Sequence, residues 1–120
     1  MLIVNDVEFM QIEERLKLSL EELFESGIGT IVITLGENGS RVIIKDNEFI
    51  VPAAKANRVV QVTGAGDAYR AGFIAGMIEN LSLEQCAKQG SVMGSFAVES
   101  FGGQMFEIDG LEFKDRLNNI

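Results

Sequence analysis

The chain has 120 residues, of which 47% are hydrophobic and 23% charged, and it carries a net charge of −8. This composition predicts one folded domain over residues 1–120, and the negative charge argues against nucleic acid or a membrane surface as a partner. The absence of histidine and the presence of one cysteine, Cys86, exclude imidazole metal sites, His-based triads and intrachain disulfides, and a cytoplasmic setting is expected.

Strand-like and helical segments are expected to alternate along the chain. The expected segments are a short strand at 1–4, helices at 5–18 and 19–27, a strand at 30–35, a hairpin of 41–45 and 48–51, a strand-like run at 57–62, and helices at 67–79, 82–100 and 109–118. The run at 30–35 reads T-I-V-I-T-L, which is typical of a strand buried on both faces in a parallel sheet. Helices and strands mixed in this way predict an α/β layered fold.

The stretch T-G-A-G-D at 63–67 lies where a strand-like run meets a predicted helix. Gly64 and Gly66 allow a turn in which larger side chains would clash. Free amide groups and the dipole of the helix favour an anion there, and the carboxylate of Asp67 at the helix start stays ionised. The alternative interpretation is a capped helix start without a ligand. Spacing excludes a P-loop, which needs Gly-Lys-Ser/Thr, and a dinucleotide fingerprint, because Tyr69 stands where a third small residue is required.

Small residues recur every four positions after Asp67, at Ala68, Gly72 and Gly76. They leave one face of the predicted helix nearly bare, so another element can approach it closely. For Gly76 the simplest interpretation is tight packing alone. The side chain of Arg70 is expected to project into solvent, and the alternative is that it assists a phosphate group.

The whole stretch T-G-A-G-D-A-Y-R-A-G-F at 63–73 closely resembles the C-terminal signature of the ribokinase-like (PfkB) sugar and nucleoside kinases. The resemblance implies ATP-dependent transfer of a phosphoryl group to a hydroxyl of a sugar or nucleoside. It places a catalytic base at Asp67, and it places an anion hole in the backbone amides of Gly64, Ala65 and Gly66. Phosphoryl transfer needs a positioned acceptor oxygen more than a strong base, which suits an ionised carboxylate.

Other stretches resemble the same family. Asn5 and Glu8 match its N-x-x-E motif, which implies that Glu8 holds Mg²⁺ through water and that Asn5 lies near the nucleotide phosphates. Without the resemblance, this pair is better interpreted as a helix cap with a solvated Glu. Ser91 falls, by its spacing from Asp67, where many relatives have a polar residue close to adenine. The family's nucleotide loop is matched at Thr34, Leu35, Gly36, Glu37, Asn38 and Gly39, which alone would be a tight turn.

A further turn, Gly102-Gly103-Gln104, resembles the G-A-Q turn of the family. The resemblance places a monovalent cation near Thr63 and Gly102. Relatives commonly have Asp where this chain has Gln61, and that Asp is a usual part of the cation site. The replacement argues against activation by K⁺.

The resemblance covers nearly the whole chain but only the C-terminal portion of the family. The expected fold is therefore a partial ribokinase-like, Rossmann-like α/β/α arrangement with a β-hairpin, in which the N-terminal part of the family fold is missing. A truncated, non-catalytic nucleotide-binding or oligomerising fragment is the alternative to an active kinase, and a remnant without ligands is a third possibility. A partial sheet exposes an edge, so we expect a homodimer formed through 1–4 or 30–35.

Overall fold

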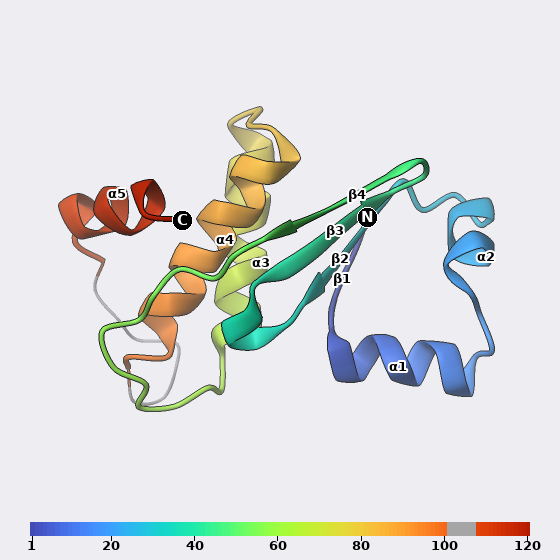
Figure 1. Ribbon diagram of the computed structural model, residues 1–120, viewed down its shortest axis with the longest axis horizontal. Helices are drawn as coiled ribbons and strands as arrows, with labels where there is room; N and C mark the ends of the chain where they lie inside the picture. Colours follow the sequence, from blue (N-terminus) through green and yellow to red (C-terminus); the bar gives the residue numbers. More distant parts are fainter. Residues whose placement is uncertain (101–107) are drawn as a thin grey trace.

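A four-stranded mixed sheet lies at the centre of the computed structural model, which describes residues 1–100 and 108–120 (Figure 1). The strands are β1 (Leu2–Asn5), β2 (Thr30–Thr34), β3 (Ser40–Ile44) and β4 (Asn47–Val51), and they lie side by side in that order. β1 and β2 are parallel, whereas β2, β3 and β4 are antiparallel to their neighbours. The prediction of a parallel-sheet strand at 30–35 therefore holds for one side of β2 only.

Helices cover both faces of this sheet. They are α1 (Asp6–Arg15), α2 (Leu20–Glu25), α3 (Ala65–Ile78), α4 (Leu83–Ala97) and α5 (Gly110–Asn118). α1 and α2 lie on one side of the sheet and α3 and α4 on the other, which gives three α/β/α layers (Figure 1). The predicted α/β fold with a hairpin is thus confirmed. Within the described residues, no helix combines the length and apolarity needed to span a bilayer.

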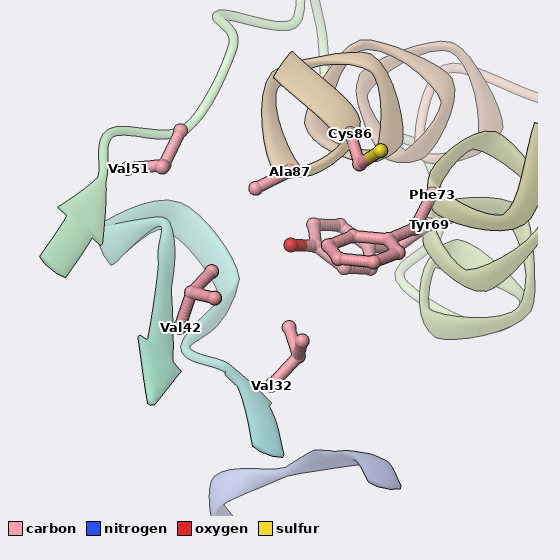
Figure 2. Close-up of a cluster of buried hydrophobic side chains, with 7 residues drawn as sticks. All are labelled: Val32, Val42, Val51, Tyr69, Phe73, Cys86 and Ala87. Carbon is pink, nitrogen blue, oxygen red and sulfur yellow. The ribbon is translucent and has the colours of Figure 1, made fainter. Parts of the chain in front are cut away.

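β2 contributes side chains to two separate cores because successive residues of a strand point to opposite faces. Ile31 and Ile33 pack beneath α1 and α2, while Val32 packs beneath α3 and α4. Figure 2 shows this second core, in which the rings of Tyr69 and Phe73 lie between the strands and α4. Its buried members are Val32, Val42, Val51, Tyr69, Phe73, Cys86 and Ala87. The strand is therefore buried on both faces, as its sequence predicts.

Local capping signals set the helix starts. α1, α2 and α4 each begin with a capping box, in which two side chains accept each other's backbone N–H groups, and such a cap contributes about 1 kcal/mol. The pairs are Asn5 with Glu8, Ser19 with Glu22, and Ser82 with Gln85. The predicted helix ends are wrong by a few residues, because α1 ends at Arg15 and α4 at Ala97.

Residues 57–62 form no strand, which corrects the prediction of a strand-like run there. Their backbone pairs with the end of a helix instead of a sheet, since the N–H groups of Val60 and Gln61 donate to the carbonyl oxygen of Val98 at 2.7 and 3.1 Å. Val59 and Val62 are 67% and 71% exposed, so these β-branched residues bury little surface. The segment is a loop between β4 and α3.

The outer strands determine where a second chain could add to the sheet. β2 has hydrogen-bonded neighbours on both sides, so the prediction that 30–35 offers an edge is wrong. β1 is paired on one side only among the described strands. β4 is likewise an outer strand, so of the two predicted segments only the N-terminal strand lies at an edge of the sheet.

Candidate functional site

A cavity of about 790 Å³ gathers predicted site residues from distant parts of the sequence. It lies among the end of β1, the turn η1 (Gly36–Asn38) after β2, the start of α3 and the middle of α4. The predicted residues that line it are Asn5, Thr34, Gly36, Glu37, Gly39, Ala65, Gly66 and Ser91. Those that do not line it are Glu8, Leu35, Asn38, Thr63, Gly64 and Asp67. The cavity thus unites most of the predicted nucleotide site, with the predicted base outside its lining.

The entry to α3 is a tight turn at Gly64. This residue has a φ of 89°, in the left-handed region that glycine adopts without strain. The first bond of the helix is donated by the amide of Ala68 to the carbonyl oxygen of Gly64 at 3.0 Å, so the amides of Gly66 and Asp67 precede it. Such amides need a partner from outside the helix, which makes this end of the helix suited to an anion.

The other residues of this turn differ from the prediction. The amide of Ala65 donates to the carbonyl oxygen of Val62 at 3.2 Å. Gly66 is helical, and a Cβ added there would approach only the guanidinium of Arg70, at 3.9 Å. The turn therefore requires glycine at Gly64, whereas the expected clash at Gly66 is absent.

The carboxylate of Asp67 is held by an arginine on the same helix. Its side chain is 75% exposed, and its Oδ1 accepts a hydrogen bond from Nη1 of Arg70 at 3.1 Å. Arg70 also donates to Glu8 and to the backbone of Ile3. The expectation that Arg70 projects into solvent is wrong, because its guanidinium contacts Ile3 of β1 and Glu8 of α1 in addition to Asp67 on its own helix.

Asn5 and Glu8 form the capping box of α1, so the predicted helix cap is correct, whereas Glu8 is not merely solvated because it pairs with Arg70. Oδ1 of Asn5 accepts the Glu8 amide at 2.7 Å, and Oε1 of Glu8 accepts the Asn5 amide at 2.9 Å. Within 1–100 and 108–120, no group of three or more Asp, Glu, Cys or His side chains is placed to hold a metal ion. A Mg²⁺ ion that keeps several waters needs only one or two carboxylates plus substrate phosphates, and the half-exposed Glu8 fits such a role.

The loop at 34–39 packs closely against the hairpin where the two meet. Gly39 has a φ of 89°, and a Cβ at this position would lie 2.0 Å from the carbonyl oxygen of Val51. The Leu35 amide also donates to the carbonyl oxygen of Gly39 at 2.8 Å. Gly36, by contrast, has open space beside it. Gly39 therefore serves the close approach of β4, while Gly36 leaves the loop open to a ligand.

Ser91 joins α4 to a loop that the sequence did not mark as part of the site. Its Oγ accepts the backbone amide of Ala54 at 2.7 Å. Residues 53–56 line the cavity together with Ser91 and Ser95. The only local signal for this loop is its position after a predicted strand, which does not identify a ligand site.

The buried side chain of Arg116 belongs to a hydrogen-bond network that holds the end of the loop after β4. Arg116 donates to Oγ of Ser95 at 2.9 Å and to both carboxylate oxygens of Glu99 at 2.7 and 3.0 Å. Glu99 in turn accepts the backbone amide of Asn57, and Glu112 accepts both Arg116 and the Asn57 side chain. The network fixes the loop to α4 and α5. In the sequence, only the spacing of four residues between Glu112 and Arg116 indicates one ion pair of this network.

Two buried titratable groups of the core beneath α3 and α4, Tyr69 and Cys86, are not suited to acid–base work near neutral pH. Tyr69 donates to Oγ of Ser40 at 2.8 Å, and its burial raises the pKa of its hydroxyl to about 12. Burial also raises the pKa of the Cys86 thiol. Gly102, Gly103 and Gln104, predicted to form the cation turn, lie outside the described residues.

Comparison with known sequences gives consistent matches. The profile described as pfkB family carbohydrate kinase matches residues 2–109. A nucleoside kinase of Methanocaldococcus jannaschii is 35% identical over 103 residues, which are 86% of this chain and 34% of the relative. An inositol 3-kinase of Arabidopsis thaliana is 35% identical over 96 residues, 80% of this chain and 26% of the relative. The chain thus spans about a third or less of these relatives.

Solved structures agree with the sequence matches. The crystal structure of the M. jannaschii nucleoside kinase superposes with a TM-score of 0.90 at 31% identity, covering 98% of this chain and 39% of that one. A Burkholderia thailandensis nucleoside kinase in complex with ADP-inosine gives a TM-score of 0.88 at 28% identity, covering 98% and 36%. A ribokinase from Thermotoga maritima, at 22% identity and a TM-score of 0.80, shows the fold. The architecture is therefore a part of the ribokinase-like α/β fold.

Proposed function

Because the chain belongs to the pfkB family of carbohydrate kinases, we propose that it carries the nucleotide-binding and catalytic side of an ATP-dependent kinase. The acceptor is a hydroxyl of a sugar or nucleoside. The observation that carries this proposal is the cavity, in which Asn5, the 34–39 loop, Gly66 and Ser91 come together from four separate segments. Its opening at the start of α3 brings the nucleotide phosphates to free backbone amides.

The proposed mechanism assigns a role to each part of the turn. The acceptor oxygen bonds to the terminal phosphorus of ATP while the bond to the leaving ADP oxygen breaks, and the acceptor proton passes to the carboxylate of Asp67. Of the turn Gly64-Ala65-Gly66, the amides of Gly64 and Gly66 stabilise the charge on the phosphoryl oxygens, because that of Ala65 donates to the carbonyl oxygen of Val62. Glu8 would hold Mg²⁺ through water and Asn5 would lie near the nucleotide phosphates, where the ion would supply positive charge.

The alternative function is a nucleotide-binding module without catalysis. It is favoured by one observation, that the chain spans about a third of the length of relatives such as the M. jannaschii enzyme. A coupled assay of the full-length protein with MgATP and a panel of sugars and nucleosides separates the two. Turnover with at least one acceptor supports the kinase, whereas MgADP binding without turnover supports the module.

We expect the 120-residue chain alone to bind MgADP with a Kd in the roughly millimolar range, about 4 kcal/mol of binding. The cavity supplies the 34–39 loop and the α3 turn, but the chain spans only about a third of the length of the nucleoside kinase that it matches. Isothermal titration calorimetry measures this affinity, with MgCl₂ alone as the control titration. Micromolar affinity would show that the site is preorganised without further chain, contrary to this expectation.

We also propose that the chain pairs with a second copy through the open edge of β1, in a cytoplasmic setting compatible with the buried free thiol of Cys86. Exposed strand edges favour pairing, and symmetric dimers are the commonest assemblies. Light scattering at micromolar concentration should therefore give twice the monomer mass. A monomeric mass would mean that the chain protects its own edge.

A further inference from the structure

Arg70 connects the two carboxylates to which the proposed function assigns chemistry. Its Nη1 donates to Oδ1 of Asp67 and its Nη2 donates to Oε1 of Glu8, each at 3.1 Å. Its Nε donates to the carbonyl oxygen of Ile3 at 3.3 Å. Each guanidinium nitrogen therefore has a different partner, and the partners lie on α3, α1 and β1.

This arrangement depends on the shape of the guanidinium as well as on its charge. A planar fork can direct separate N–H groups toward separate acceptors, whereas the single ammonium of lysine is a compact point charge. Glu8 lies 62 residues from Arg70, and its Oε1 also closes the capping box with Asn5. Arg70 thereby fixes the first turn of α1 relative to the first turn of α3.

Stability alone gives little reason for these contacts. The side chains of Arg70, Glu8 and Asp67 are 34%, 46% and 75% exposed, and ion pairs so exposed to water contribute little to folding. The contacts instead determine position, because they join Asp67 in the first turn of α3 to Glu8 in the first turn of α1. In a chain with a net charge of −8, Arg70 also places a cation between two anions where a polyphosphate would bind.

We propose that Arg70 is a positioning residue that holds Asp67 and Glu8 in a fixed relative orientation, so that acceptor-side and phosphate-side groups are aligned together. The proposal rests on the proposed kinase function for its catalytic consequence. The geometric part, that Arg70 orients Asp67 relative to Glu8, does not depend on catalysis. The geometric and the catalytic parts are therefore measured separately.

The geometric part is tested by ¹H–¹⁵N NMR of the chain, without any ligand. Asp67→Asn should shift the backbone amide of Glu8 in the wild-type background, because Arg70 links the two side chains. The same substitution should leave that amide unmoved in Arg70→Gln and Arg70→Lys backgrounds, while the remaining amides stay dispersed. An equal shift in all backgrounds, or none in the wild type, would overturn the link.

The catalytic part is tested by steady-state kinetics of the full-length protein. Arg70→Gln and Arg70→Lys should both lower kcat on the order of ten- to a hundredfold, with KM for MgATP nearly unchanged, because misplaced groups cost rate more than binding. Normal kcat in Arg70→Lys would overturn positioning in favour of charge alone. The absence of turnover in the wild type would contradict the proposed function. The NMR result would then test by itself whether Arg70 connects Asp67 with Glu8.

Arg41 provides a matched control. Its side chain is also 34% exposed, and it pairs with Glu48 at 2.6 Å on the hairpin. Arg41→Gln removes a comparable surface ion pair from a position outside the cavity lining. It should change neither kcat nor the Glu8 amide shift, and a fall in kcat equal to that of Arg70→Gln would show that the effect is not specific to Arg70.

Discussion

Replacing Asp67 with Asn is expected to lower kcat of the full-length protein by about a thousandfold or more, with nucleotide affinity little changed. Asn keeps the size of the side chain but cannot accept the proton of the acceptor hydroxyl. Nucleotide affinity should survive because Asp67 does not line the cavity and is 75% exposed at the start of α3. Steady-state kinetics at saturating acceptor give kcat, and calorimetry gives the affinity for MgADP.

Glu84→Gln is the matched control for this substitution. Glu84 is also an acidic residue in the first turn of a helix, and it pairs with Lys88 one turn further on at 3.4 Å. Its neutralisation removes one charge and one exposed ion pair without touching the cavity. We expect wild-type kcat in Glu84→Gln. Near-normal kcat in Asp67→Asn would refute the assignment of Asp67 as the base.

Features of the fold that depend on neighbours in sequence could be predicted from the sequence. The capping boxes at Ser19 and Ser82 each need residues within three positions, and both are present in the structure. The β-branched run at 30–35 predicts burial on both faces because its composition leaves no polar face, and Ile31, Val32 and Ile33 are all buried. The hairpin of β3 and β4 also follows from local composition, although its turn lies at Lys45 and Asp46, one residue before the predicted position.

Features that depend on distant contacts could not be predicted. Residues 57–62 have strand-like composition, but the amides of Val60 and Gln61 bond to Val98, and none of the described strands pairs with this segment. Arg70 could be placed three residues from Asp67, yet its contact with Glu8 exists only after α1 and α3 meet beside β1. The cavity residues at 53–56 are set by the bond from Ala54 to Ser91, which spans 37 residues. Tertiary structure decides each of these.

The face of α3 that carries Gly72 and Gly76 could be predicted only in part from the sequence. The sequence predicts a close approach at Gly72 and Gly76, and the structure confirms it: added Cβ atoms would lie 2.7 Å from Met93 and 3.0 Å from Cys86. The sequence does not show that α4 also contributes a glycine to the contact with α3. Gly90 faces the backbone of Tyr69, so the two helices approach each other through small residues on both sides.

Substituting Gly90 with Ala should therefore destabilise the protein, although alanine is the better helix former. A Cβ at Gly90 would lie 2.8 Å from the carbonyl oxygen of Tyr69 and 3.2 Å from two atoms of its ring. The backbone cannot yield without separating α3 from α4, and such overpacking costs about 1–3 kcal/mol or more. That cost should exceed the gain in helix propensity of about 1 kcal/mol. Urea unfolding followed by circular dichroism gives the free energy of unfolding.

Gly94→Ala separates the two terms, because Gly94 lies one turn further along the same helix. A Cβ there would lie 3.5 Å from the carbonyl oxygen of Ala65, an ordinary contact. Only the propensity term remains, so this variant should be neutral or more stable by up to about 1 kcal/mol. If Gly90→Ala were as stable as Gly94→Ala, α3 and α4 could not be packed as closely as described. The difference between the two variants thus measures the close packing of α4 against α3 that holds Tyr69 in the lining of the cavity.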